Sequence, residues 1–445
     1  MSVVVVGAGL AGLRIASELD DVILLESRSV PGGRVRTSYD ISGVVEYEAG
    51  PWRIPGDHTR VRSLFEREGL TLVPLATPSV HTSRAPSVRP GVSIWDANVL
   101  QFDTSPPYAD MADLATGYAD QTSAASGSSP YTTASGAFSV CPSGFTSLVS
   151  KLSERVRDVR YDHRVVDVFV DVHGYSVHVS QRVSSTCFKS YVIRCATLFV
   201  CVPPSVSRDW TALRDHARST MCSVTGGELC HVYVKHDAMP SHTHHLNPDS
   251  ILSQTVSSQY GNSWFQASYS GGRIARFWKH LHNHDVTMFW STLRNALYRW
   301  YGIHVPRDTE HRFHHWPCAY HQWLPVPSFD MRRAVYNAIE PNPSVLPRLF
   351  IAGEAFSSHQ AWMEGALETA ELALVRYHGS GGGVFPASDS DTRIDGCPID
   401  VSRWCKSHPG GESALLNHTG EDMGVYMRHI GHSDGAWAIA HSLKR

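Results

Sequence analysis

Short apolar runs separated by glycines open the chain. Four valines occupy residues 3–6, a stretch broken by three glycines follows, and a second apolar run at 22–25 ends at an acidic residue. Buried strands are often apolar runs of this length that turn residues bound on each side. Residues 3–26 therefore predict a strand, a glycine turn, a helix over residues 13–19 and a second strand.

A similar pattern recurs twice later in the chain. Residues 142–202 predict a short helix and then strands, because apolar and polar residues alternate there as they do in half-buried strands. Residues 348–378 predict another strand, a turn and a long helix. We infer that these pieces and the N-terminal one form a single α/β domain. It is interrupted by insertions at about 60–141 and 205–345.

The second insertion and the C-terminal end differ in composition from this domain. The insertion is rich in Trp, Tyr and His, which suits either a substrate domain with an aromatic-lined cavity or an aromatic core. Residues 379–393 are rich in glycine and serine and predict a flexible linker. A small third unit, 394–445, follows the linker.

Composition and charge narrow the classes of partner. The chain has 445 residues, is 42% apolar and carries a formal net charge of −3 without blocks of like charge, so no nucleic-acid partner is expected. It has no run of about 18 apolar residues, so no membrane span is predicted. Nine scattered cysteines without a CxxC motif are typical of reduced thiols, and the expected location is the cytoplasm.

The first turn has the spacing of a dinucleotide-binding motif. Gly7, Gly9 and Gly12 follow a strand and open a helix in the order G-x-G-x-x-G. The first glycine allows a tight turn, the second lets the backbone approach a pyrophosphate, and the third lets the helix pack on the strand. Ala11, within the turn, is also a predicted cofactor contact. Glu26 ends the second strand, where an acid can accept hydrogen bonds from ribose hydroxyls and disfavours a 2′-phosphate.

The residues after Glu26 point to FAD. Residues 27–36 read SRSVPGGRVR, in which Gly33 permits close backbone approach and Arg34 places a guanidinium beside the phosphates. This run resembles the flavin amine oxidase family, which includes monoamine, polyamine and L-amino-acid oxidases. The resemblance covers roughly residues 3–378 and implies FAD as the cofactor.

The family's closing motifs stand near the end of the same region, as LFIAGE and AWMEGALET. The resemblance implies that Glu354, preceded by Gly353, contacts the ribityl or phosphate portion of the flavin. It implies that Trp362 lies against the flavin ring and that the helix start at Met363 offers N–H groups to the pyrimidine oxygen. It also implies a backbone contact between Val165 and adenine. Relatives usually have glycine before the aromatic residue, where this chain has alanine.

The motif EAGPWRIP suggests the substrate. In the family, the positions of Gly50, Pro51 and Trp52 lie beneath the flavin, so these residues are predicted cofactor contacts. Arg53 and the surrounding stretch 50–70 resemble the L-amino-acid oxidase branch, in which the matching arginine pairs with the substrate α-carboxylate. A planar guanidinium can donate two hydrogen bonds to a carboxylate and fix its orientation. The alternative is a structural arginine in an ion pair.

Two tryptophans complete the predicted catalytic set. Trp362 is a candidate for an aromatic wall beside the substrate amine. Trp323, in YHQWLP, resembles an aromatic position found in several relatives, although a core residue is the other interpretation. Many relatives also carry a lysine that holds a water near flavin N5. The segment GGELCHVYV at 226–234 has none, and Lys235 is expected to point elsewhere.

The C-terminal unit resembles cytochrome b5. SHPGG precedes GEDMGVYMRHIGHS, with 24 residues from His408 to His432. The resemblance implies that these two histidines are axial ligands of the iron of haem b, a centre that carries single electrons. The unit lacks the strands and helix that usually precede HPGG, so a remnant that binds no haem is the alternative.

Together these features predict an α/β fold: a Rossmann-type FAD-binding domain interleaved with an α+β substrate domain, plus a small b5-like α+β module. The predicted function is FAD-dependent oxidative deamination of an amine-bearing carboxylate by hydride transfer to flavin N5. Oxygen, which would yield hydrogen peroxide, or the b5-type haem is the predicted electron acceptor. The alternatives are a monoamine or polyamine oxidase and a flavin and haem electron-transfer protein without amine turnover. The predicted boundaries are 1–60, 142–204 and 346–378 for the FAD-binding domain, 61–141 and 205–345 for the substrate domain, 379–393 for the linker and 394–445 for the b5-like module.

Overall fold

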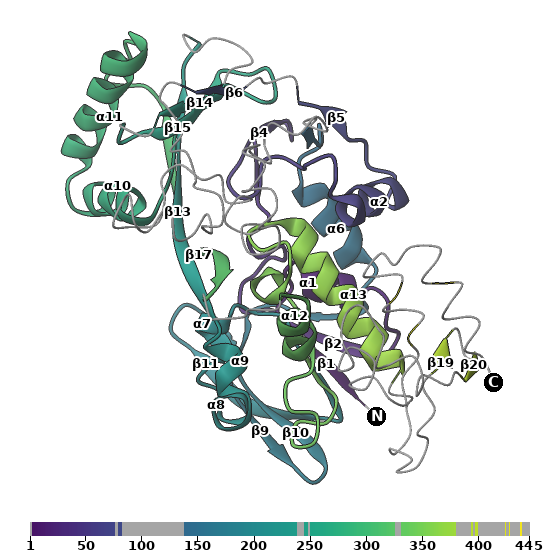
Figure 1. Cartoon of the computed structure of the whole chain (residues 1–445). Helices are drawn as coiled ribbons and strands as arrows, with labels where there is room; N and C mark the ends of the chain where they lie inside the picture. Colours follow the sequence, from purple (N-terminus) through teal and green to yellow (C-terminus); the bar gives the residue numbers. More distant parts are fainter. Residues whose placement is uncertain are drawn as a thin grey trace. The chain divides into compact units, whose positions relative to one another are not determined.

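A parallel five-stranded sheet holds the glycine turn (Figure 1). The computed structural model describes residues 2–75, 79–81, 138–237, 244–247, 250–324 and 331–379, and beyond these residues 393–394, 397–398, 423, 427 and 437. Contacts divide the chain into two units, Met1–Ala373 and Leu374–Arg445. In the second unit, β19 (Arg393–Ile394) pairs with β20 (Cys397–Pro398).

The sheet has the order β18-β12-β1-β2-β8, and all of its pairings are parallel. Its strands are β1 (Val3–Val6), β2 (Val22–Leu25), β8 (Asp158–Arg160), β12 (Thr197–Val200) and β18 (Leu349–Ile351). The valines of β1 are buried because this strand is central and α1 (Leu10–Ala16) packs against it. The helix begins three residues earlier than predicted, because the backbone becomes helical directly after the extended Gly9.

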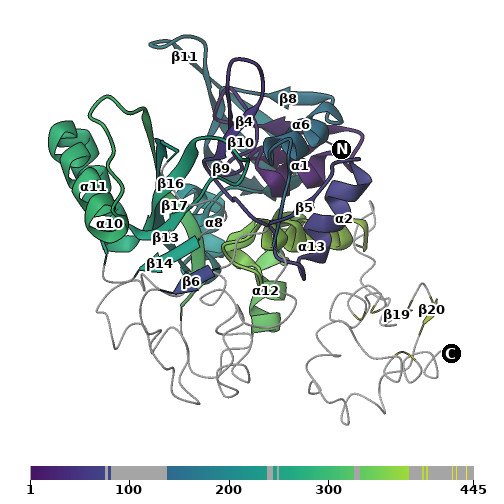
Figure 2. The same cartoon turned by 90° about the horizontal axis from the view of Figure 1, so that it is seen from above.

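A six-stranded sheet of the order β17-β13-β16-β15-β14-β6 belongs to the same unit. Its strands are β6 (Ser79–His81), β13 (Val224–Lys235), β14 (His244–Asn247), β15 (Ser253–Val256), β16 (Trp264–Gly271) and β17 (His311–Trp323). Helices α10 (Gly272–His284) and α11 (Val286–Tyr301) cover it on the side away from α1 (Figure 2).

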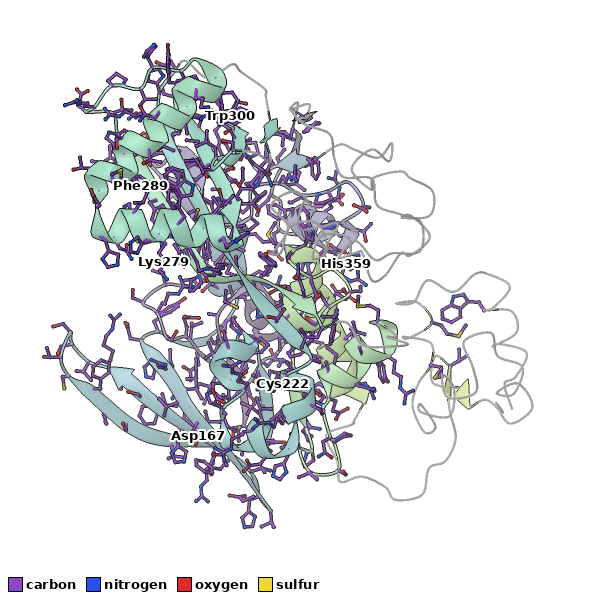
Figure 3. The ribbon with its side chains drawn as sticks, turned by 60° about the vertical axis from the view of Figure 1, so that its left-hand side comes forward. Asp167, Cys222, Lys279, Phe289, Trp300 and His359 are labelled. Carbon is purple, nitrogen blue, oxygen red and sulfur yellow. The ribbon has the colours of Figure 1, made fainter. Side chains whose placement is uncertain are left out.

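The aromatic residues of the second insertion divide between a core and a cavity wall. Trp278 and Phe289, from α10 and α11, are fully buried against the sheet with their rings 5.3 Å apart (Figure 3 labels Phe289). Tyr269, from β16, lies instead on the cavity described below. Both interpretations of the aromatic composition therefore apply, each to different residues.

The described residues form further strands and helices. A three-stranded antiparallel sheet consists of β9 (His163–Asp171), β10 (Gly174–Arg182) and β11 (Phe188–Cys195). The short strands are β3 (Thr37–Tyr39), β4 (Val45–Glu48), β5 (Val73–Pro74) and β7 (Ser139–Val140). The other helices are α2 (Thr59–Arg67), α6 (Thr146–Glu154), α7 (Pro204–Ser207), α8 (Thr211–His216), α9 (Arg218–Met221), α12 (Met331–Ile339), α13 (Met363–Gly379) and the 3₁₀ turn η1 (Glu354–Phe356). No helix among the described residues is long and apolar enough to cross a membrane.

Glu48, at the end of β4, is a fully buried carboxyl that joins three segments. It accepts hydrogen bonds from the backbone N–H of Phe145, from the Thr37 hydroxyl and from the Tyr260 hydroxyl, at 2.9 Å each. Burial raises the pKa of Glu48 to about 8, although the three hydrogen bonds oppose the rise. The neutral carboxyl is therefore the form that the fold favours.

Replacing Glu48 by glutamine is expected to flatten the pH dependence of stability. Because the folded pKa lies above the unfolded one, this group stabilises the fold below about pH 4.5 and loses that contribution as pH rises through about 8. Between pH 5 and 9, the free energy of unfolding of the wild type should fall by about 3 kcal/mol relative to that of Glu48→Gln. Urea unfolding at several pH values measures the difference. Glu66→Gln, at an exposed carboxylate, is the control, and parallel profiles for the wild type and Glu48→Gln would contradict the assignment.

Candidate active site

A cavity of about 750 Å³ brings together residues from both ends of the first unit. A volume of this size is typical of ligand and cofactor sites. Fifteen of the predicted site residues line it: Gly7, Gly9, Ala11, Glu26, Gly33, Arg34, Gly50, Pro51, Trp52, Arg53, Val165, Gly353, Glu354, Trp362 and Met363. Residues more than 300 positions apart in the sequence therefore line the same cavity.

One glycine of the turn borders space that is open to a ligand, whereas the others allow close contact with neighbouring protein atoms. A Cβ on Gly12 would lie 1.9 Å from the carbonyl oxygen of Gly7, so this glycine permits the contact between helix and strand and lies behind the cavity wall. Gly7 has φ +101°, a conformation that favours glycine. No protein atom lies within 4 Å of a Cβ built on Gly9. The open space at Gly9 is where a pyrophosphate would approach the backbone.

The acidic residue at the end of β2 is held in place by backbone groups. The backbone N–H of Ala8 donates to Glu26 Oε2 at 2.8 Å, and that of Arg28 donates to Oε1 at 2.9 Å. An ionised carboxylate has about four lone-pair directions, so Glu26 retains acceptor capacity toward the cavity. This geometry suits ribose hydroxyls.

Arg34 and Glu354 join the N-terminal and C-terminal motifs directly. Arg34 Nη1 donates to Glu354 Oε1 at 2.5 Å and to the carbonyl oxygen of Ala319 at 2.8 Å. The backbone N–H of Ala361 donates to Glu354 Oε2 at 2.8 Å. Burial alone would raise the pKa of Glu354, but the charges of Arg34 and His321 hold it well below its usual range. Glu354 is therefore ionised, and it orients Arg34 beside the glycine turn.

The segment before α13 contains a strained residue and an unsatisfied donor. Ala361 has φ +71°, a left-handed conformation in which the glycine usual in relatives would avoid strain. The next residue, Trp362, lines the cavity, and its ring lies edge-on to His58 at 5.0 Å. Its indole nitrogen is buried without a hydrogen-bond partner among the described residues. The open space at Gly9, on the same cavity as Arg34 and Trp362, fits a cofactor that carries a pyrophosphate and an aromatic ring, such as FAD.

Arg53 is close to two aromatic rings at the cavity wall. Its Cζ is 4.4 Å from the centroid of the Trp52 ring and 4.1 Å from that of Phe138. The side chain is buried, with 4% of its surface exposed. Both rings are within cation–π distance of the guanidinium, whose N–H donors point outward in the plane of the group. That plane is the direction in which a carboxylate binds with two hydrogen bonds.

Trp323 lies in the core and does not line the cavity among the described residues. Its Nε1 donates to the carbonyl oxygen of Ser357 at 3.0 Å, and its backbone N–H donates to Gln360 Oε1 at 2.9 Å. The tryptophan therefore supports the segment that carries Glu354. Lys235 is half exposed and lies 3.5 Å from Glu310, away from the cavity as expected.

Several cavity residues were not predicted from the sequence. Leu229 and His231 face the cavity from β13, where the expected lysine is absent, and Tyr269 faces it from β16. His231 is buried, and burial lowers its pKa to about 3, so it is a neutral imidazole. Its Nδ1 lies 2.7 Å from Gln266 Nε2. The alternation of β13 places positions 229 and 231 on one face, but only the sheet's position relative to the glycine turn identifies that face as the cavity side.

Comparisons with known proteins agree with this geometry. The sequence profile of flavin-containing amine oxidoreductases matches residues 10–116 and 115–373, and that of the cytochrome b5-like heme/steroid binding domain matches residues 395–444. An L-amino-acid oxidase from Daboia russelii is 38% identical over 74 residues, which are 16% of this chain and 15% of that protein. The match thus spans a small part of the curated relative.

A solved structure described as a protoporphyrinogen oxidase from Exiguobacterium sp. 255-15 has the same fold. It aligns with a TM-score of 0.58 and 13% identity over 85% of this chain and 99% of that one. The fold class predicted from the sequence is confirmed, whereas the predicted haem ligands His408 and His432 lie outside the described residues. The chain belongs to the flavin-containing amine oxidoreductases, which use FAD, and its C-terminal end is a cytochrome b5-like domain.

Proposed function

We propose that this protein oxidatively deaminates an L-amino acid, with Arg53 as the residue that binds the substrate carboxylate. The observation that carries the proposal is the position of Arg53: a buried guanidinium, within cation–π distance of Trp52 and Phe138, on the same cavity as the glycine turn and Glu354. The similarity of 74 residues to an L-amino-acid oxidase supports the same substrate class.

In this proposal the chain's residues act by binding and orientation. Arg53 donates two in-plane hydrogen bonds to the α-carboxylate and thereby fixes the direction of the substrate Cα–H. Trp362 and Tyr269 provide apolar walls that exclude water. FAD, when bound, supplies the acceptor for the hydride from Cα, and the imino acid that results hydrolyses to a 2-oxo acid and ammonia.

The charges of the cavity favour a carboxylate over a simple amine. An acidic side chain available to a cationic substrate would favour a monoamine or polyamine. Among the described lining residues the acids are Glu26 and Glu354. Backbone N–H groups hold Glu26, and Arg34 and His321 hold Glu354. The basic residue at the wall, Arg53, would instead repel an ammonium group.

Anaerobic reduction of the flavin tests the proposed substrate. The purified full-length protein is mixed with a panel of L-amino acids, their D-enantiomers and the amines that result from their decarboxylation. We expect the visible flavin absorbance to bleach with L-amino acids only. Bleaching by amines alone would make the protein an amine oxidase with a structural Arg53. Absence of bleaching with every compound would favour an electron-transfer protein.

We also propose that His408 and His432 ligate haem iron in the b5-like domain. Two axial imidazoles leave no open position on the iron, so such a haem would carry electrons rather than bind oxygen, and it would be an alternative acceptor to oxygen. His408→Ala and His432→Ala should each abolish the sharp haem absorption band of the purified protein and leave the flavin bands unchanged. His418→Ala, in the same domain, is the control. A wild-type protein expressed with excess haem that shows no haem band would contradict the proposal.

A further inference from the structure

A cysteine, a histidine and a glutamate form a hydrogen-bonded row at the wall of the cofactor cavity. Cys318 Sγ lies 3.2 Å from His321 Nε2, and His321 Nδ1 lies 2.6 Å from Glu354 Oε1. His321 and Glu354 are almost fully buried, whereas Cys318 is half-buried and lines the cavity. Small molecules in the cavity can therefore reach the Cys318 sulfur, whereas the His321 and Glu354 side chains are held in the protein interior.

The neighbouring strand leaves space for this row. β13 pairs with β17 so that Gly226 stands opposite His321. A Cβ on Gly226 would lie 2.8 Å from Cys318 Sγ and 3.6 Å from His321 Nε2. A side chain at position 226 would therefore displace the Cys318 sulfur. The Ser205 hydroxyl, from α7, also lowers the pKa of Cys318.

The charges along the row favour an ionised sulfur. Burial alone would raise the pKa of Cys318, but the hydrogen bond and charge of His321, with Ser205 and Arg34, bring it below its ordinary value. Burial alone would lower the pKa of His321, but Glu354 and Cys318 raise it to about 9. These interactions favour a thiolate beside an imidazolium over a thiol beside a neutral imidazole.

Among the described residues, Cys201 is the other cysteine that lines the cavity, and burial raises its pKa. Burial raises the pKa of Cys195 to about 12, and it raises that of Cys230 further. Cys187 and Cys222 are exposed, the latter labelled in Figure 3. Nucleophilic character in a thiol follows from thiolate formation together with access, and Cys318 combines the two.

We propose that Cys318 is a nucleophilic thiolate and a site of covalent modification by small electrophiles, and that modification and FAD binding exclude each other. With iodoacetamide, the sulfur bonds to the CH₂ carbon and iodide leaves. With hydrogen peroxide, the sulfur attacks one oxygen, the O–O bond breaks, hydroxide leaves, and the thiolate is oxidised by two electrons to a sulfenic acid. Because Cys318 shares the cavity wall with Gly33 and Arg34, a group added to its sulfur would occupy space that the cofactor needs.

Alkylation of the purified full-length protein, with each cysteine followed by peptide mass spectrometry, tests this proposal. Rates with iodoacetamide are measured from pH 5 to 9, before and after saturation with FAD. We expect Cys318 to reach its half-maximal rate at a lower pH than Cys187 and Cys222, and to be protected at least tenfold by FAD. Cys318 that is unreactive, or that follows the pH profile of the two exposed cysteines, would overturn the proposal.

Two histidine variants test whether His321, and not accessibility alone, makes Cys318 reactive. His321→Gln should move the pH midpoint of Cys318 alkylation to that of an ordinary thiol, about 8.5, and leave the rates of Cys187 and Cys222 unchanged. His359→Gln is the matched control, because His359 pairs with Glu368 at 2.9 Å and is not a member of the row (Figure 3). An unchanged Cys318 profile in folded His321→Gln protein would also overturn the proposal. None of these readouts depends on the substrate proposed above.

Discussion

Replacing Arg53 by alanine is expected to lower kcat/KM for L-amino acids by about two to three orders of magnitude. Removing one partner of a desolvated, hydrogen-bonded charge pair costs about 2–5 kcal/mol, and about 1.4 kcal/mol corresponds to a factor of ten. Arg53→Lys should recover only part of the loss, because an ammonium group keeps the charge but cannot present two parallel donors. Steady-state kinetics with a good amino-acid substrate measure both effects.

The control for Arg53 is an arginine that supports the same segment from outside the cavity. Arg62 Nη1 donates to the Ser139 hydroxyl at 2.9 Å, and Ser139 pairs through its backbone with Ile54. Arg62→Ala should therefore change stability slightly and kcat/KM by less than about threefold. Full activity of Arg53→Ala on amino acids, with normal FAD content, would make Arg53 a structural residue.

Alanine at Gly9 is expected to prevent FAD binding without unfolding the protein. The backbone of Gly9 has φ −75°, which alanine adopts readily, and no protein atom lies within 4 Å of the added Cβ. The methyl group instead occupies the space that the pyrophosphate needs. We expect the affinity for FAD to fall at least about a hundredfold, or about 3 kcal/mol. The melting temperature of the FAD-free protein should stay within a few degrees of the wild type.

Gly12 provides the contrasting variant. A methyl group at position 12 would lie 1.9 Å from the Gly7 carbonyl oxygen, which is backbone and cannot move aside cheaply. Gly12→Ala should therefore lower both FAD affinity and the melting temperature of the FAD-free protein. Titration with FAD and thermal unfolding of the two variants distinguish a ligand-facing glycine from a packing glycine. Equal loss of stability in both would contradict the roles assigned here.

The local motifs of the cofactor site could be predicted from the sequence because each depends on few residues. The glycine spacing, Glu26 and the GGR run can be recognised within a stretch of about 30 residues. The closing motif can be recognised within about 20. Their convergence on one cavity follows from the parallel sheet, in which β1, β2, β12 and β18 end at the same edge. The domain boundaries and the individual roles of these residues remain predictions.

The substrate side of the cavity could not be predicted in the same way. Leu229, Tyr269 and Cys318 come from three different strands, and their common face depends on antiparallel register and on bulges such as the one between Gly227 and Leu229. Trp323 illustrates the opposite case. Its motif resembled a cavity position, but it lies at the end of β17, where its indole satisfies the Ser357 carbonyl in the core.

The order of strands in the parallel sheet has a consequence for synthesis of the protein. β1 is made first, yet one of its neighbours is β12, and the edge strand β18 begins at Leu349. Glu354, which pairs with Arg34, follows β18 in the sequence. A nascent chain on the ribosome therefore carries its glycine turn through most of translation without the partners that complete the cofactor site. We expect FAD to be captured only after residues near Met363 have emerged, and truncated chains that end before β18 to depend on chaperones.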